Sequence, residues 1–153
     1  MDNFEQGVQR LPIQLPEALA LSRLQTQQVQ SISPVALAYI GDAVFELYVR
    51  LKFLWPPQRI QAFHHQVVSQ VKAEQQADFL VQLIPHLDEA EADIVRRGRN
   101  ATSKSPRRLS AKVYRQATAF ETLVGYLYIT NQERLFELLH QLTISPSVNP
   151  KSI

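Results

Sequence analysis

The stretch YIGDAVFELYVR, residues 39–50, belongs to a long run of apolar residues at helical spacing. Ser33-Pro34 supplies an N-cap followed by a proline at the first helical position, and Pro56-Pro57 stops a helix. We therefore expect one helix over about 34–54, and because it is apolar almost all round it should be central in the domain. An acid in the middle of such a helix, Asp42, needs an explanation.

An ion pair within the helix explains the neighbouring acid, Glu46, better than it explains Asp42. Glu46 is four residues before Arg50, so these two side chains can form an ordinary helix pair. Aspartate is a poor residue for a helix interior, and Gly41 beside it costs about a further 1 kcal/mol against alanine. A Gly-Asp pair at this position indicates a close backbone approach and a carboxylate with a task. We also expect Gly41 to leave room for an ion and a phosphate at Asp42.

The rest of the chain is punctuated as a series of helices, and no stretch shows sustained strict alternation, so the predicted fold class is all-α. The expected elements are an early helix near 16–29, a helix or broken pair over 58–84 that ends at Pro85, a helix opened by a capping box of Asp88 and Glu91, one from Ser110 through about 129, and one from Asn131 through about 142. We predict a single domain over 1–153, with a core over about 30–142 and flexible ends at 1–15 and 143–153.

Composition restricts the class of protein. The 153 residues include no cysteine, which excludes disulfides and thiolate metal sites. The N-terminus lacks the pattern of a signal peptide, and no apolar run reaches the ~18 residues that span a bilayer. The expected location is the cytoplasm, with no membrane contact.

Positive charge is concentrated in one segment. Residues 96–115 contain eight Lys and Arg residues and no acid, although the net charge of the whole chain is only +2. Such a block is the footprint expected of a surface that binds a polyanion, most often nucleic acid. A solvated loop explains a basic run equally well.

A second isolated acid lies in the predicted helix over 111–129. Glu121 is surrounded by apolar residues and has no Lys or Arg three or four residues away on either side. An unpaired carboxylate in such a place either shifts its pKa or binds a cation. Two carboxylates from different helices suit Mg²⁺, which takes one or two protein carboxylates, waters and phosphate oxygens. Together with the basic segment, they indicate a metal-dependent phosphodiesterase.

Four blocks of the sequence resemble one known family, in that family's order. ALAYIGDAVFELYVR (36–50) is similar to the signature of the ribonuclease III catalytic domain, and especially to its short form, the Mini-ribonuclease III family. The resemblance continues through VKAEQQA (71–77), RRGRNA (96–101) and YRQATAFETLVGYLY (114–128). It covers the chain from about 34 to 140.

The resemblance implies an all-helical endoribonuclease that works as a homodimer and cuts double-stranded RNA with Mg²⁺, for which Mn²⁺ can substitute. Asp42 and Glu121 match the family's catalytic, metal-binding acids. The implied reaction is attack on the scissile phosphate by a metal-activated water, which leaves a 5′-phosphate and a 3′-hydroxyl. The implied substrate is precursor 23S ribosomal RNA. Val35 and Thr118 stand where full-length ribonuclease III has two further acids, and the short form shares both reductions.

RNA contacts are expected in the catalytic domain itself, because no double-stranded-RNA-binding domain is expected after Ile153. Phosphates and 2′-hydroxyls of duplex RNA suit Arg, Lys and Asn side chains on a projecting segment. The candidates are Arg97, Arg99, Asn100, Lys104, Arg115 and Lys72. For each of them an ordinary surface position is the alternative, and for Lys72 packing of its aliphatic stem.

Tyr39 matches the place where the larger family has an aromatic residue that helps to form the dimer contact. A tyrosine buried in the core is the alternative. For the protein as a whole, the competing hypothesis is a non-catalytic RNA-binding or ribosome-associated module that retains the fold.

Overall fold

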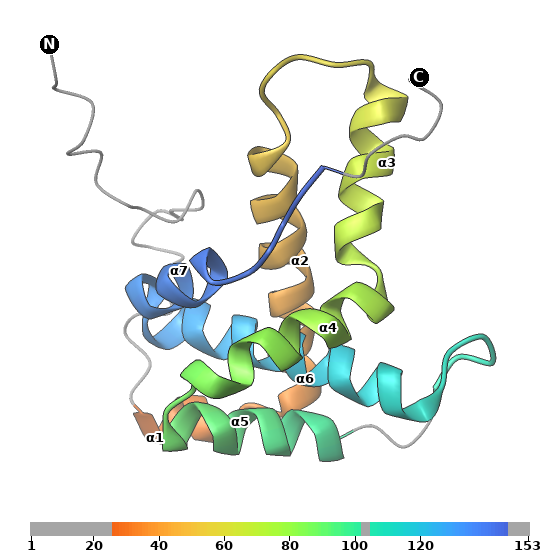
Figure 1. Ribbon diagram of the computed structural model, residues 1–153. Coiled ribbons are helices and arrows are strands. Elements are labelled where there is room, and N and C mark those ends of the chain that lie inside the picture. The colour runs from red at the N-terminus through yellow and green to blue at the C-terminus, as the bar shows by residue number, and fades with distance from the viewer. Residues whose placement is uncertain (1–25, 102–104, 147–153) are drawn as a thin grey trace, which may run out of the picture.

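The protein is a bundle of helices around two that cross at its centre (Figure 1). The computed structural model describes residues 26–101 and 105–146. Its helices are α1 (Thr26–Gln30), α2 (Pro34–Lys52), α3 (Ile60–Val71), α4 (Ala73–Leu83), the short 3-10 helix η3 (Ile84–His86), α5 (Glu89–Asn100), α6 (Ala111–Thr130) and α7 (Gln132–His140). The described part of the chain has no strand, which confirms the all-α prediction.

Helix starts follow the caps that the sequence predicts. The side chains of Ser33, Ser110 and Asn131 each accept a hydrogen bond from the backbone N–H three residues later, at α2, α6 and α7. At α5 the predicted capping box is complete, because Asp88 accepts from the backbone of Glu91 and the Glu91 side chain accepts from the backbone of Asp88. These bonds satisfy donors that a helix leaves unpaired at its first turn.

The segment expected as one helix or a broken pair over 58–84 is a broken pair. Lys72 separates α3 from α4 with an extended backbone, φ −67° and ψ 154°.

Beyond α7, the Thr143 N–H donates to Gln82 Oε1 at 3.0 Å and Ile144 is buried. The expected early helix over 16–29 is described only from residue 26. The expected flexible end over 1–15 lies outside the described residues, and of the expected flexible end over 143–153 only residues 143–146 are described. Among the described helices, none has the length and apolar character needed to cross a membrane.

Three phenylalanines lock the central helices together. The ring centroids of Phe45 on α2 and Phe120 on α6 are 4.9 Å apart, and Phe79 on α4 lies 5.8 Å from Phe45, both in edge-to-face contact. All three side chains are 0% exposed. Aromatic pairs in this arrangement add roughly 0.5–1.5 kcal/mol to the burial of their area. They fix α4 against the crossing of α2 and α6.

A partly buried ion pair joins α7 to α5. Arg134 Nε donates to Glu91 Oε1 at 2.7 Å, and one terminal nitrogen of the same guanidinium donates to the His86 carbonyl at 2.6 Å. Glu91 is only 3% exposed, so its charge is compensated by Arg134 rather than by water.

The backbones of α2 and α6 touch at two glycines. A Cβ built on Gly41 would lie 1.8 Å from the Glu121 carbonyl oxygen, and one on Gly125 would lie 1.9 Å from the Leu37 carbonyl oxygen. Only residues without a side chain allow this approach. The expected close backbone approach at Gly41 is therefore present. The expectation that Gly41 leaves room for an ion and a phosphate is wrong, because the backbone of α6 fills that space.

One side of α2 and the loop after it remain exposed and apolar. In Figure 1, α2 and α3 extend side by side beyond the other helices. We call the exposed side chains there the apolar face: Val35, Tyr39, Ile40, Leu47, Leu51, Leu54, Trp55 and Ile60. The prediction that α2 is central holds for its other side, which packs on α6.

Candidate active site

The two isolated acids of the sequence come together where α2 crosses α6. Because Gly41 lies against the backbone of Glu121, the next residue of α2, Asp42, is held beside the side chain of Glu121. The two carboxyl groups interact directly. Asp42 is exposed and Glu121 is half-buried, so the pair opens to solvent on the side of Asp42. By contrast, Glu46 forms the predicted pair with Arg50, at 2.7 Å.

The surroundings of Glu121 disfavour its charged form. Burial, and secondly the negative charge and hydrogen bonding of Asp42, raise the pKa of Glu121 from 4.5 to about 8. At neutral pH the pair therefore retains a proton that one isolated carboxylic acid would have lost. A cation between the two groups would offset the repulsion and favour the ionised form of Glu121.

Gln76 on α4 is a third polar side chain at this place. It is 2% exposed, and its Nε2 atom has no full hydrogen bond to any described residue, but its amide lies near enough to Glu121 to lower the pKa of that acid. Sequence reasoning missed Gln76. The available signal was its spacing, because it precedes the buried Phe79 and Leu80 by three and four residues and so faces the core.

The donor set fits a hard divalent cation held by few protein ligands. In the described part of the chain, no group of three or more His, Asp or Glu residues is placed to hold a metal ion. Two carboxylates from two helices, with an unpartnered amide behind one of them, are enough for an ion whose other ligands are water or phosphate oxygens. Asp42 and Glu121 are the residues that would hold it.

Position 118 carries a buried threonine instead of a third acid. Thr118 is buried, and its carbonyl accepts a hydrogen bond of 2.7 Å from Thr122 Oγ1. The same hydroxyl is 3.3 Å from the Pro34 carbonyl at the start of α2. A Cβ on Gly98 would lie 2.6 Å from Thr122 Oγ1, so α5 also packs closely here. Thr122, the residue after Glu121, thus joins α2, α5 and α6.

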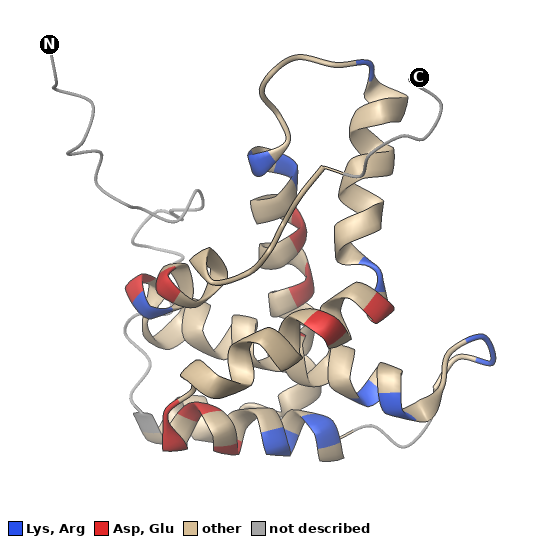
Figure 2. Ribbon diagram, viewed as in Figure 1, with Lys and Arg blue, Asp and Glu red and all other residues tan. Residues whose placement is uncertain are grey.

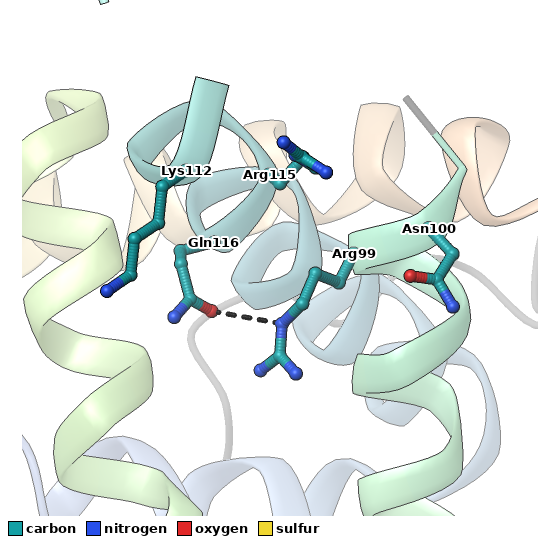
Figure 3. A pocket seen from close by; sticks show the side chains of 5 residues that line it. All are labelled: Arg99, Asn100, Lys112, Arg115 and Gln116. Atoms are coloured by element: carbon teal, nitrogen blue, oxygen red, sulfur yellow. Dashed lines mark hydrogen bonds between the residues drawn. The ribbon is translucent and has the colours of Figure 1, made fainter. Parts of the chain in front are cut away.

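The close packing of α5 on α6 builds a basic pocket. A pocket of about 420 Å³ is lined by the end of α5 and the start of α6, through Arg99, Asn100, Lys112, Arg115 and Gln116 (Figure 3). Arg99 Nε donates to Gln116 Oε1 at 3.3 Å. Figure 2 shows that cations gather in this region, whereas most acidic residues lie on α2, α4, α7 and the start of α5. Gln116 is five residues from Glu121, roughly 8 Å along the helix axis.

The structure brings together three of the six candidates for RNA contact. Arg99, Asn100 and Arg115 line the basic pocket, and Lys112 and Gln116, which were not chosen, line it with them. Their signal was helical spacing, since Gln116 is one turn after Lys112.

The other candidates lie apart from this pocket. Arg97 donates from a terminal nitrogen to the Gln30 carbonyl at 3.4 Å, and so contacts α1. Lys72 is exposed at the break between α3 and α4, and Lys104 lies outside the described residues. Tyr39 is 81% exposed, and is therefore a surface residue rather than a core tyrosine in this single chain.

Comparisons with known proteins show the family to which the chain belongs. A family model described as the Ribonuclease III domain matches residues 35–132. A protein named Mini-ribonuclease 3 from Synechocystis sp. is 51% identical over 86% of this chain and 92% of its own length. Mini-ribonuclease 3 from Thermoanaerobacter sp. is 44% identical over 76% of this chain and 84% of its own length.

Among solved structures, the crystal structure of a protein from Fusobacterium nucleatum superposes with a TM-score of 0.68 at 30% identity, over 72% of this chain and 91% of that chain. The family model covers most of the described helices, and the named relatives are matched over most of their own length. This chain is therefore an endoribonuclease of the ribonuclease III family and belongs to its Mini-ribonuclease 3 branch.

Proposed function

We propose that this protein cuts double-stranded RNA with a Mg²⁺ ion held by Asp42 and Glu121. The observation that carries the proposal is the contact between these two acids from different helices, with the pKa of Glu121 raised to about 8. Such a pair gains from a bound cation. When bound, the metal supplies charge stabilisation at phosphate oxygens and an acidified water. Mn²⁺ uses the same hard oxygen ligands and can substitute.

The basic pocket is the proposed grip on the RNA backbone. Arg99 uses Nε to hold Gln116, which fixes its guanidinium while its terminal nitrogens remain to bind a phosphate. Asn100, Lys112 and Arg115 add donors on the same pocket. We extend the proposal to Arg97, Lys104 and Lys72 as outlying contacts, because duplex RNA spans a larger surface than one pocket.

The proposed working form is a homodimer. The apolar face leaves Tyr39 81% and Trp55 79% exposed, which is costly for an isolated chain in water. A twofold dimer places the same patch of each chain against its copy. Sedimentation equilibrium of the wild type and of Tyr39→Glu tests this. If the wild type had the mass of a monomer at all concentrations, the proposed homodimer would be contradicted.

The proposed cellular task is maturation of precursor 23S ribosomal RNA in the cytoplasm, with 5′-phosphate and 3′-hydroxyl products. Support for this comes from the resemblance of the four sequence blocks to the short-form family. The competing proposal is a non-catalytic module that binds RNA or ribosomes through the basic pocket alone.

Cleavage and binding measured together separate the two proposals. We expect the wild type to cut a long RNA duplex in Mg²⁺ and to stop in EDTA. Asp42→Asn and Glu121→Gln should each slow cleavage by more than about 100-fold, because losing even an outer partner of a metal ligand costs about 10- to 100-fold.

Binding of the duplex by both variants should stay close to that of the wild type, since neither side chain lines the basic pocket. Equal cleavage by the variants would remove Asp42 and Glu121 from the reaction. Duplex binding without cleavage by the wild type, in any divalent metal, would favour the non-catalytic module.

A further inference from the structure

Gln76 is a buried polar side chain whose amide nitrogen has no partner to justify its burial. It is 2% exposed and belongs, with Ala77, Phe79 and Leu80, to the buried side of α4. Among the described residues, its Nε2 is the only buried side-chain donor or acceptor without a hydrogen bond. Leaving a buried amide unpaired costs roughly 1–3 kcal/mol, so leucine of similar size would make a more stable core. The glutamine therefore indicates a role other than packing.

The group that Gln76 faces is Glu121. The buried side chain of Gln76 lies close enough to the Glu121 carboxyl group to interact with it. An amide can donate to a carboxylate without adding charge, whereas another acid here would increase the repulsion with Asp42. The amide thus approaches Glu121 from α4, while Asp42 approaches it from α2.

We propose that Gln76 is a positioning residue for Glu121, whose amide donates to one carboxylate oxygen and leaves the other oxygen for the cation shared with Asp42. This inference rests on the proposed metal site. Partners that hold a metal ligand from behind fix its orientation and raise the affinity of the site. Because position 118 is a threonine, the proposed site has only two acids, Asp42 and Glu121. A partner that holds Glu121 therefore fixes one of the two protein ligands.

Gln70 provides a matched control. It is also a glutamine with a buried side chain, 8% exposed, but it lies on α3 and its Nε2 donates to the Ser145 carbonyl at 3.1 Å. Its amide is held by the segment after α7, and it is not among the groups that affect the Glu121 carboxyl. Replacing each glutamine by leucine therefore removes a similar buried amide, once next to Glu121 and once elsewhere.

Mn²⁺ affinity of the RNA-free protein, measured by isothermal titration calorimetry, separates positioning from packing. We expect Gln76→Leu to bind Mn²⁺ about 10-fold more weakly than the wild type. Its melting temperature in EDTA should be equal or higher, because an unpaired amide has been removed. Gln70→Leu should do the reverse, with a lower melting temperature and unchanged Mn²⁺ affinity. A structural role for Gln76 would not separate affinity from stability in this direction.

Gln76→Glu provides a second variant with the length of the native side chain. A third carboxylate beside Asp42 and Glu121 should lower the melting temperature in EDTA, and Mn²⁺ should raise it by more than in the wild type. An effect of Mn²⁺ no larger than in the wild type would overturn the proposed contact. The proposed contact would also be overturned if Gln76→Leu bound Mn²⁺ with unchanged affinity, in an experiment where the wild type binds Mn²⁺ and Asp42→Asn does not. A wild type that binds no Mn²⁺ would instead overturn the proposed metal site and, with it, this role of Gln76.

Discussion

At the scale of single residues, the surroundings of Glu121 destabilise its charged form in the metal-free protein. Its carboxyl group is half-buried next to another acid, and these two causes raise its pKa to about 8. In the unfolded chain the same group titrates near 4.5. Between these values the folded protein holds a proton that the unfolded chain has released. Stability therefore falls as pH rises from about 4.5 towards 8.

Replacing Glu121 by glutamine should remove this dependence on pH. Glutamine resembles the protonated acid, so near pH 4.5 and below, Glu121→Gln and the wild type should unfold at similar temperatures in EDTA. At pH 8 the variant should be more stable by at least about 1.4 kcal/mol, the value of one pKa unit. Calorimetry of both proteins across this range checks the prediction. Glu133→Gln, on the exposed surface of α7, controls for loss of one negative charge. If Glu121→Gln gained the same stability at pH 4.5 as at pH 8, the prediction would be contradicted.

At the scale of helices, the glycine contact between α2 and α6 sets the distance between the two acids. A methyl group on Gly41 would lie 1.8 Å from the Glu121 carbonyl oxygen, so the helices would have to separate. We expect Gly41→Ala to lower the free energy of unfolding by about 1–3 kcal/mol or more, as overpacking does, although alanine favours helices by about 1 kcal/mol. Because Asp42 moves with the backbone, Mn²⁺ affinity should fall as well.

Ala43→Gly is the matched control for the Gly41 prediction. Ala43 is exposed on the same helix, two residues away, so its loss costs only about 1 kcal/mol of helix preference. Urea unfolding and Mn²⁺ titration of both variants test the comparison. A Gly41→Ala protein with native stability and native affinity would show that the approach of α2 and α6 does not govern the acidic pair.

The same helices show which features could be predicted from sequence. Caps at Ser33, Asp88 and Ser110 were predicted correctly because each depends on residues within one turn. The break at Lys72 could only be left open, since neither glycine nor proline marks it. The approach at Gly41 was predicted, but the group that fills the space was not, because that group belongs to α6. Gln76 was missed because its neighbour Glu121 is distant in sequence.

At the scale of the whole molecule, charge is divided between a basic region and the acidic pair. Arg99, Lys112 and Arg115 line one pocket where α5 meets α6. If these cations bind phosphates, replacing all three by alanine should weaken duplex binding in proportion to the counterions that they release. The slope of log affinity against log salt should become shallower by about one for each phosphate that the variant no longer binds.

Arg96→Ala is the control for this prediction. Arg96 is an exposed cation of α5 that pairs with Asp93 outside the pocket, so its loss should leave the slope almost unchanged. Fluorescence anisotropy with Asp42→Asn as the parent protein measures binding without cleavage. Equal slopes for the triple variant and its parent would place the RNA on another surface.

The contact of Gly41 and Gly125 with the backbone of the facing helix also bears on how the enzyme loses activity with heat. Backbone in contact with backbone has no alternative rotamers, so the spacing of the two backbones that carry the acids cannot loosen gradually as side chains gain motion. It is lost only when α2 and α6 part, and their separation also exposes Phe45 and Phe120. Thermal inactivation and cooperative unfolding should then be a single event, with no warm, folded and inactive state between them.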